Sequence, residues 1–247
     1  MARQRLGQHF LSSRPVLERI AAAACAPGQP LVIEIGPGKG ALTAHLLARA
    51  RRVVVIEIDP AMVDHLRQTF AHEPRLEIIA ADALQADFSQ WGPAAFTGNL
   101  PYYVATPILE RVAPMGGVFL IQKEVAERVT ARPGSKAYGY LTVLLALFAS
   151  SEMLFTVKPG AFRPPPKVDS AVIRLRPHAR AAELGIADPR KFLEFVSACF
   201  RQKRKTLRNN LIGVNIKHSI EGMPEATLRA EQLTLEQFAH LFRRLAP

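Results

Sequence analysis

The 247-residue sequence has little cysteine and none of the cysteine spacings that hold metals. Its two cysteines, Cys25 and Cys199, stand among apolar neighbours, without a CxxC pair or a histidine at the spacing of a zinc site. The sequence therefore argues against a disulfide framework and against a metal site built on cysteine. We expect two buried free thiols in a reducing compartment.

Long apolar segments are also absent. No run reaches the roughly eighteen consecutive apolar residues that a membrane-spanning helix needs. The basic N-terminal stretch has only a short apolar run, which begins at Ile20 and follows Arg14, Pro15, Glu18 and Arg19, and this does not fit a signal peptide. There is no internal repeat or low-complexity tract. We therefore expect a soluble, cytoplasmic protein that has no membrane partner.

Positive charge, by contrast, is plentiful and unevenly placed. The formal net charge is +11, and residues 171–247 hold 14 Lys and Arg against 7 Asp and Glu, whereas residues 1–170 hold 18 against 14. A basic C-terminal portion suits a polyanionic partner, most simply a nucleic acid. Charge that only keeps the protein in solution explains the composition equally well at this point.

Short β-rich runs alternate with helical patterns over the first two thirds of the chain. This alternation is typical of a mainly parallel sheet covered by helices, and seven strands fit one open sheet. The expected strands are residues 31–35, 53–58, 76–80, 94–99, 117–122, 153–157 and 170–175, and the expected helices between them are 40–50, 60–71, 105–113, 124–130 and 140–150.

The end of this pattern differs from the rest. The last two strands are separated by "KPGAFRPPPKVD", which is too short and too rich in proline for a crossover helix, so we expect them to form an antiparallel pair. After residue 177 the patterns are helical only, over 190–212 and 227–245. The sequence thus predicts an α/β domain over residues 1–177 and a small all-α domain over residues 178–247.

The stretch "VIEIGPGKGALTAHLL" places Gly36, Gly38 and Gly40 between the first strand and the helix that follows. Glycines allow a tight turn and the close approach of a ligand, but alone they fit a structural turn or an NAD site equally well. Glu57 ends the second strand, where it can accept hydrogen bonds from both hydroxyls of a ribose, and Asp82 follows the third, where it can accept from the amine of an adenine. This combination suits an adenosine without a pyrophosphate and favours S-adenosylmethionine over NAD; solvated loop acids are the alternative.

The segment "GNLPYY" follows the fourth strand, so it should lie at the same edge of the sheet, beside the methyl group of that cofactor. If the methyl acceptor is the N6 amine of an adenine, its lone pair is delocalised into the ring and makes a poor nucleophile. The Asn99 side-chain oxygen and the Leu100 carbonyl could accept the two N6 hydrogens and direct the lone pair at the methyl group. No general base is needed, because the amine loses its proton only after attack.

Pro101 and two tyrosines complete this segment. Pro101 fixes φ and donates no competing hydrogen bond, and Tyr102 can stack on a base that has been removed from its helix. The alternative is a strand that ends in an Asn-Pro turn with two packed tyrosines. We expect Tyr103 to serve packing rather than catalysis.

Seven motifs stand in order along the chain: "LGQHFL", "EIGPGKGALT", "VIEID", "ADAL", "GNLPYYVATPIL", "FRPPPKVDSAVIRL" and "FRQKRKTLRNNL". In this series the sequence resembles the KsgA-type small-subunit rRNA adenine dimethyltransferases over essentially its whole length. The resemblance implies a class I, Rossmann-like methyltransferase that adds two methyl groups to N6 of each of two adjacent adenosines, in a hairpin near the 3′ end of small-subunit rRNA. S-adenosylmethionine is the implied donor.

The resemblance also implies roles for individual residues. Phe162, in the proline-rich loop, would be a second aromatic wall opposite Tyr102, and stacking on both faces of an adenine agrees with this; ordinary loop packing is the alternative. Arg163 and Lys167 flank this loop and could hold phosphates beside the target base. The implied cofactor contacts are His9, Leu11, Gly36, Gly38, Glu57, Asp82 and Asn99, although His9 stands where many members have asparagine.

The cations of the last motif indicate RNA contacts. We expect the partner to be small-subunit rRNA within a pre-30S particle, and the enzyme to be a monomer without a metal. These cations are expected on a helix, where a merely solvated face is the alternative. The residues are Arg201, Lys203, Arg204, Lys205 and Arg208.

Two other functions stay open. Related dimethylases that modify a large-subunit rRNA adenosine and confer antibiotic resistance share the same core, and an RNA-binding assembly factor could methylate only incidentally. "FRPPPKVDSAVIRL" and "RKTLRNNL" favour the small-subunit branch.

Overall fold

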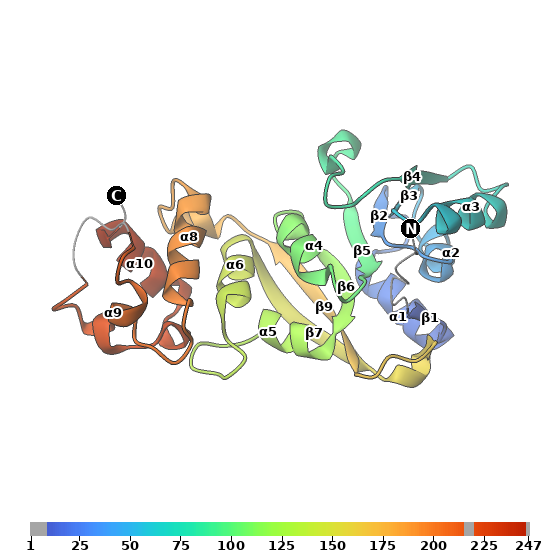
Figure 1. The fold of residues 1–247 in the computed structure, drawn as a ribbon. Helices are drawn as coiled ribbons and strands as arrows, with labels where there is room; N and C mark the ends of the chain where they lie inside the picture. Colours follow the sequence, from blue (N-terminus) through green and yellow to red (C-terminus); the bar gives the residue numbers. More distant parts are fainter. Residues whose placement is uncertain (1–8, 215–219, 246–247) are drawn as a thin grey trace, which may run out of the picture. The chain divides into compact units, whose positions relative to one another are not determined.

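The computed structural model describes residues 9–214 and 220–245 (Figure 1). The chain divides into two compact units, each made of two segments. The first unit contains residues 1–126 and 152–176, and the second contains residues 127–151 and 177–247.

The second unit includes the segment 127–151, which the sequence-based division near residue 177 left with the α/β domain. Packing explains this membership. Val143 and Leu147 of the segment are buried in the same apolar cluster as Phe192 and Phe238. The segment therefore completes the core of the second unit, a relation that local periodicity does not reveal.

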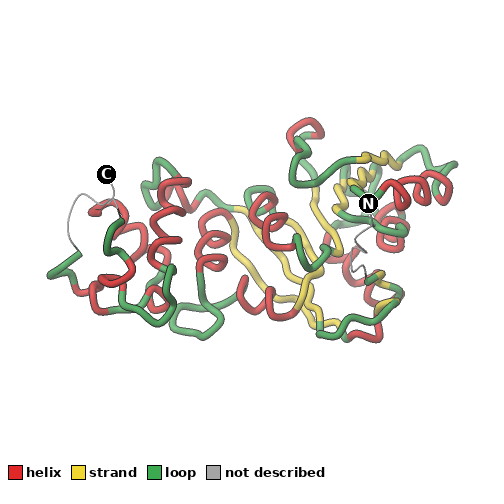
Figure 2. Tube along the Cα trace, viewed as in Figure 1, coloured by secondary structure: helices red, strands yellow, loops and turns green. Residues whose placement is uncertain are grey.

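A seven-stranded sheet forms the centre of the first unit, as predicted (Figure 2), and its strand order is β4-β3-β2-β5-β6-β9-β7. Strands β2 to β6 are parallel neighbours, whereas β9 runs antiparallel to β6, with Phe119 opposite Ile173. The strands are β2 (Val32–Ile35), β3 (Val53–Glu57), β4 (Leu76–Ala80), β5 (Ala95–Asn99), β6 (Gly117–Gln122), β7 (Ala149–Val157) and β9 (Ser170–Pro177).

Helices connect the strands where the sequence predicts them. The carboxylate of Asp59 caps α3 by accepting from the Ala61 backbone N–H at 2.9 Å, and Pro60 begins that helix because a first turn needs no N–H donor there. The helices that precede β7 are α1 (Arg14–Ala24), α2 (Ala41–Leu47), α3 (Pro60–Thr69), α4 (Ala105–Val112), α5 (Lys123–Val129) and α6 (Tyr140–Phe148). Two 3-10 turns, η1 (Phe88–Trp91) and η2 (Pro159–Ala161), precede β5 and β8 (Phe162–Arg163).

One face of the sheet is covered by α1 and α2. Leu17 and Ile20 of α1 and Leu46 of α2 are buried together with Val32 and Val55 of the strands. The central strands are thus apolar on this face, as parallel strands flanked by helices must be.

A second, two-stranded sheet ties the N-terminal segment to the proline-rich loop. Strand β1 (Phe10–Leu11) pairs antiparallel with β8 (Phe162–Arg163), with Leu11 opposite Phe162. The Ser12 backbone N–H extends the contact by donating to the Ala161 carbonyl at 2.8 Å. Two-residue strands carry no readable periodicity, so the sequence did not indicate this pairing.

From Arg180 onward the described residues form helices and loops. The N-terminus of α8 is capped by Asp188, whose carboxylate accepts from the Arg190 and Lys191 backbone N–H groups. These elements are α7 (Arg180–Glu183), α8 (Pro189–Cys199), α9 (Leu207–Asn210) and α10 (Leu235–Leu245), with 3-10 turns η3 (Pro224–Thr227) and η4 (Ala230–Gln232).

The predicted helices over 190–212 and 227–245 are shorter in the structure. The first is broken between Cys199 and Leu207, and the second reaches α-helical form only at Leu235. Buried Asn210 explains the first break. Its Nδ2 donates to the carbonyls of Cys199 at 2.8 Å and Gln202 at 3.1 Å, and its Oδ1 accepts from the Gln202 N–H at 3.0 Å. These hydrogen bonds fold the intervening residues into a turn.

Both cysteines are buried free thiols, as predicted, and burial raises the pKa of Cys199 to about 12. Within the described ranges 9–214 and 220–245, no helix has the length and apolarity needed to cross a bilayer. The same residues contain no group of three or more His, Cys, Asp or Glu side chains arranged to hold a metal ion.

We predict that Asn210→Ala destabilises the second unit by about 1–3 kcal/mol, because it leaves buried backbone groups without partners. The neighbouring Asn209→Ala is a matched control, since Asn209 is exposed. Urea unfolding of the full chain, with amide exchange at residues 200–206, measures both. Equal effects of the two substitutions would contradict the role given to the Asn210 side chain.

Candidate active site

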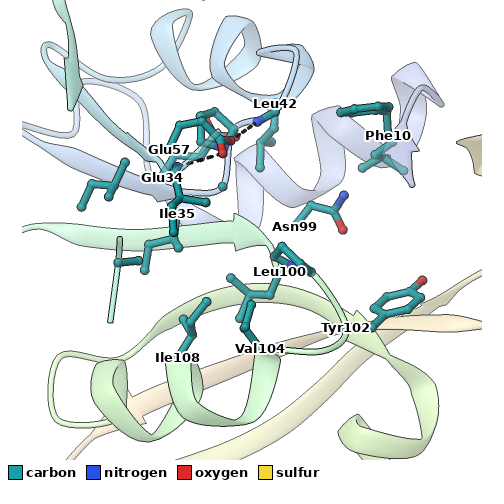
Figure 3. A pocket seen from close by; sticks show the side chains of 18 of the residues that line it. Phe10, Glu34, Ile35, Leu42, Glu57, Asn99, Leu100, Tyr102, Val104 and Ile108 are labelled. Carbon is teal, nitrogen blue, oxygen red and sulfur yellow. Dashed lines mark hydrogen bonds between the residues drawn. The ribbon is translucent and has the colours of Figure 1, made fainter. Parts of the chain in front are cut away.

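A pocket in the first unit lies where β2, β3 and β5 end (Figure 3). Its walls come from the glycine turn after β2, from the N-terminal strand β1 and from the segment that follows β5. Every predicted cofactor contact and all but one of the predicted catalytic residues line it, namely His9, Leu11, Gly36, Gly38, Glu57, Asp82, Asn99, Leu100, Pro101 and Tyr102.

Gly36 and Gly40 of the turn after β2 both have positive φ, but each position requires glycine for a different reason. A Cβ on Gly40 would lie 2.6 Å from the Phe70 ring, so this glycine is needed for packing between α2 and α3. A Cβ on Gly36 would come no closer than 3.7 Å to Pro101, so here the φ of +67° is the constraint. The side of Gly36 that lacks a Cβ faces the Asn99–Pro101 segment across the pocket.

Glu57 links the end of β3 to the glycine turn. Its Oε1 accepts from the backbone N–H groups of Ile58 and Asp59, both at 2.9 Å, and its Oε2 accepts from the Gly38 N–H at 3.1 Å. A carboxylate offers about four acceptor sites, so these three bonds leave about one, on Oε2. A ribose that used both hydroxyls on Glu57 would therefore have to share or replace the Gly38 contact.

Glu34 is a pocket residue that the sequence reading missed, because it was counted as part of an apolar strand. Its side chain is buried, and its Oε2 accepts from the Thr43 hydroxyl at 2.6 Å. Burial, opposed by the Thr43 hydrogen bond and reinforced by the charge of Glu57, raises the pKa of Glu34 to about 8. Glu34 is therefore mainly neutral at pH 7. The signal in the sequence that could have identified Glu34 is a carboxyl side chain among the apolar residues of β2.

The Asn99 amide has a defined orientation. Its Nδ2 donates to the His9 backbone carbonyl at 3.1 Å, and since a carbonyl only accepts, the nitrogen must occupy that side. The Oδ1 then faces Tyr102, as Figure 3 shows. The next residue, Leu100, has a buried side chain, and its N–H donates to the Leu120 carbonyl of β6 at 3.0 Å. The backbone under the pocket is thus anchored to the sheet.

The hydroxyl of Tyr102 is bonded to β9, the last described strand along the chain. The Tyr102 hydroxyl lies 2.6 Å from the Ser170 hydroxyl, which is buried at the start of β9. Partial burial raises the pKa of Tyr102, against the effect of this hydrogen bond, so the phenol stays neutral at pH 7. The His9 ring lies beside it, with 5.9 Å between ring centroids, and the His9 Nδ1 donates to the Pro164 carbonyl at 2.9 Å.

Comparison with known proteins places this site in a family. A family model described as ribosomal RNA adenine dimethylase matches residues 1–246. A curated relative from Acidobacterium capsulatum, called ribosomal RNA small subunit methyltransferase A, is 42% identical over 98% of this chain and 90% of its own. A relative of the same name from Xanthomonas campestris pv. campestris is 44% identical, with 97% and 95% covered.

The chain belongs to the ribosomal RNA adenine dimethylase family. Solved structures agree with this assignment and with the Rossmann-like fold. A dimethyladenosine transferase from Plasmodium falciparum is 26% identical with a TM-score of 0.80, covering 95% of this chain and 96% of its own. The 23S rRNA methyltransferase ErmE is 29% identical with a TM-score of 0.71, covering 96% of this chain and 100% of its own.

The structure corrects two expectations about aromatic residues of this adenine dimethylase. Phe162 has no exposed surface; it packs in the core beside Leu11 and does not line the pocket, so the predicted wall opposite Tyr102 is wrong for this conformation. The cause is the β1–β8 pairing, which turns the ring inward. Tyr103 is 61% exposed and lines the pocket, so it does not serve core packing.

The predicted RNA-contacting cations of the adenine dimethylase are all exposed. Arg163 and Lys167 lie on the proline-rich loop of the first unit. The remaining cations are in the second unit, in the turn between α8 and α9 and at the start of α9, so the expectation of one continuous helix face is wrong. They are Arg201, Lys203, Arg204, Lys205 and Arg208.

We predict that the stability advantage of Glu34→Gln over the wild type grows as pH rises. The folded protein keeps a proton on Glu34 up to about pH 8, whereas the unfolded chain releases it near its ordinary pKa of 4.5. The unfolded state then binds fewer protons, and wild-type stability falls between these values by at most about 1.4 kcal/mol per pH unit. Urea unfolding at pH 5, 6.5 and 8 measures the difference. A difference that does not change with pH would refute the neutral state of Glu34.

Proposed function

We propose that this adenine dimethylase transfers methyl groups from S-adenosylmethionine to N6 of two adjacent adenosines near the 3′ end of small-subunit rRNA, giving N6,N6-dimethyladenosines. The observation that carries the chemistry is the Asn99 amide, whose oxygen faces Tyr102 because its nitrogen is held by His9. The choice of the small subunit rests on relatives of that name at 42% and 44% identity, against 29% for the 23S rRNA methyltransferase.

The charges of the pocket fit S-adenosylmethionine. Two acids, Glu57 and Asp82, line the pocket against one lysine, Lys39, while Glu34 is mainly neutral and adds little charge. This balance favours a cationic sulfonium over the negative pyrophosphate of a dinucleotide. When bound, S-adenosylmethionine supplies an electrophilic methyl group. The Gly36 turn, with its φ of +67° and without a side chain, allows the cofactor to approach the backbone closely.

Two acids would hold the adenosine portion of the cofactor. We assign one ribose hydroxyl as a donor to the free acceptor site on Glu57 Oε2. The second ribose hydroxyl would displace the Gly38 N–H from the same oxygen. The Asp82 Oδ1 accepts from the Leu84 N–H at 2.9 Å, so we assign its Oδ2 to the exocyclic amine of the adenine. His9 and Leu11 border the same space from β1.

The protein contributes position and polarity to the transfer. The Asn99 Oδ1 and the Leu100 carbonyl accept the two N6 hydrogens of the target adenine, which concentrates the lone pair on the face turned to the methyl group. Tyr102, fixed through Ser170, stacks on the flipped base. The N6 proton leaves to solvent after attack, when the nitrogen is cationic, so no side chain has to act as a base beforehand.

The cations carry the affinity for RNA. Arg163, Lys167 and the cations of the α8–α9 turn neutralise backbone phosphates, which gives affinity without sequence choice. We place the reaction in the cytoplasm on a pre-30S particle, with the enzyme acting as a monomer. One chain suffices, because the residues assigned to both substrates line a single pocket.

We expect Asn99→Ala to lower the rate of methyl transfer by at least about 100-fold, as loss of one preorganised polar group at a reacting centre does elsewhere. Binding of S-adenosylhomocysteine should remain measurable by calorimetry, which separates loss of chemistry from loss of the fold. Transfer from S-adenosylmethionine to unmethylated small subunits is the readout. Turnover near the wild-type value would contradict the mechanism, and rescue of subunit assembly without methylation would favour the assembly-factor role.

The second unit's part in RNA binding has its own test. The double variant Arg204→Gln, Lys205→Gln should weaken binding to small-subunit rRNA and flatten the dependence of log Kd on log salt by about 1.5, if each cation contacts one phosphate. Arg51→Gln with Arg67→Gln is the control, since it removes equal charge from the first unit. Equal slopes for the two double variants would show that the turn does not contact the RNA backbone.

A further inference from the structure

Two apolar side chains stand exposed at the rim of the pocket. Among the described residues, the large hydrophobic side chains that are most exposed are those of Ile58, Tyr103, Val168 and Ile212. Ile58, at 57%, and Tyr103, at 61%, line the pocket, whereas the other two do not. A single exposed aromatic ring is ordinary, but a pair at one rim marks surface that a ligand covers.

The adjacent tyrosines Tyr102 and Tyr103 face different neighbours. The hydroxyl of Tyr102 is bonded to Ser170 of β9, on the side proposed for the target base. Tyr103 lines the pocket together with Glu57 and Asp82, and partial burial and then the charges of these two acids raise its pKa. The two tyrosines therefore have different neighbours in the pocket.

The turn that carries Tyr103 is short and internally bonded. The Val104 N–H donates to the Pro101 carbonyl at 3.1 Å, and α4 begins at the next residue, Ala105. The backbone at Tyr103 is thus fixed by its neighbours, while the exposed ring has room to change rotamer. A ring on a fixed backbone beside two carboxylates can close onto a ligand held by those carboxylates.

We propose that Tyr103 is a cofactor-binding residue that covers the adenosine portion of S-adenosylmethionine, with Ile58 contributing apolar surface to the same portion. This inference rests on the proposed function and extends it. The "NLPYY" segment then supplies one tyrosine to each of two adenines: Tyr102 to the base that is methylated and Tyr103 to the cofactor. Beside two negative charges the phenol remains neutral, so its ring and its O–H donor are both available.

The ring should contribute more than the hydroxyl. Stacking of an aromatic side chain on a base is sequence-independent and strong enough to change a dissociation constant about 10-fold. We therefore expect Tyr103→Ala to raise the Kd for S-adenosylhomocysteine about 10-fold and Tyr103→Phe to change it about 2-fold or less. Because the side chain is mostly exposed, neither change should lower the unfolding temperature, which is checked first.

Calorimetry of the full chain with two probes tests the assignment to adenosine. S-adenosylhomocysteine contains the amino-acid end, and 5′-methylthioadenosine does not, so Tyr103→Ala should weaken both by the same factor. Tyr102→Ala is the matched control: it should leave both Kd values within about 2-fold of the wild type and raise the KM for small subunits instead.

The opposite results overturn the inference in distinct ways. Unchanged Kd values in Tyr103→Ala would remove Tyr103 from the cofactor site, and a loss confined to S-adenosylhomocysteine would move it to the amino-acid end. A rise only in the KM for small subunits would make Tyr103 an RNA contact. A wild-type chain that binds neither probe would overturn the proposed function itself, which the Tyr103 variants alone do not do.

Discussion

The hydrogen bond from the Asn99 amide to the His9 carbonyl determines what the pocket can do. An asparagine amide carries an acceptor oxygen and an NH2 group, and here one N–H donates to a backbone carbonyl 90 residues away in sequence, which fixes the side on which the oxygen lies. His9 is itself held, through the β1–β8 pairing and through its Nδ1 on the Pro164 carbonyl. The proline-rich loop thus acts on the chemistry indirectly, by holding the segment that orients the amide.

The pocket combines two environments, which the proposed function assigns to two adenines. On one side lie the carboxyl groups of Glu57 and Asp82, while burial keeps Glu34 mainly neutral and limits the negative charge. On the other side, Asn99, the Leu100 carbonyl and Tyr102 present acceptors and a ring without a net charge. In the proposed function, a cationic donor would be drawn to the first side and a neutral base would be oriented on the second.

The sequence predicted most of what depends on local pattern and on topology. β-rich runs identified each strand of the large sheet, and because parallel strands end at one edge, Gly36, Glu57, Asp82 and Asn99 could be placed together before any coordinates. The His9–Asn99 bond was out of reach, because it depends on a backbone carbonyl in a two-residue strand.

The failures share one cause, which is that tertiary contacts override local pattern. Phe162 was expected at the pocket, but pairing with Leu11 turns it into the core. The cations after Cys199 were expected on a helix, but buried Asn210 folds them into a turn. Segment 127–151 joins the second unit through side chains that pack far along the chain. None of these tertiary contacts can be predicted from the local sequence around the residues that form it.

The central claim is that this pocket methylates adenine N6 in small-subunit rRNA. Its most direct test is to incubate the full chain with isotope-labelled S-adenosylmethionine and ribosomes that lack these methyl groups, then map the label by mass spectrometry of rRNA fragments. We expect two adjacent N6,N6-dimethyladenosines near the 3′ end of small-subunit rRNA. Label confined to large-subunit rRNA, or on an atom other than adenine N6, would contradict it.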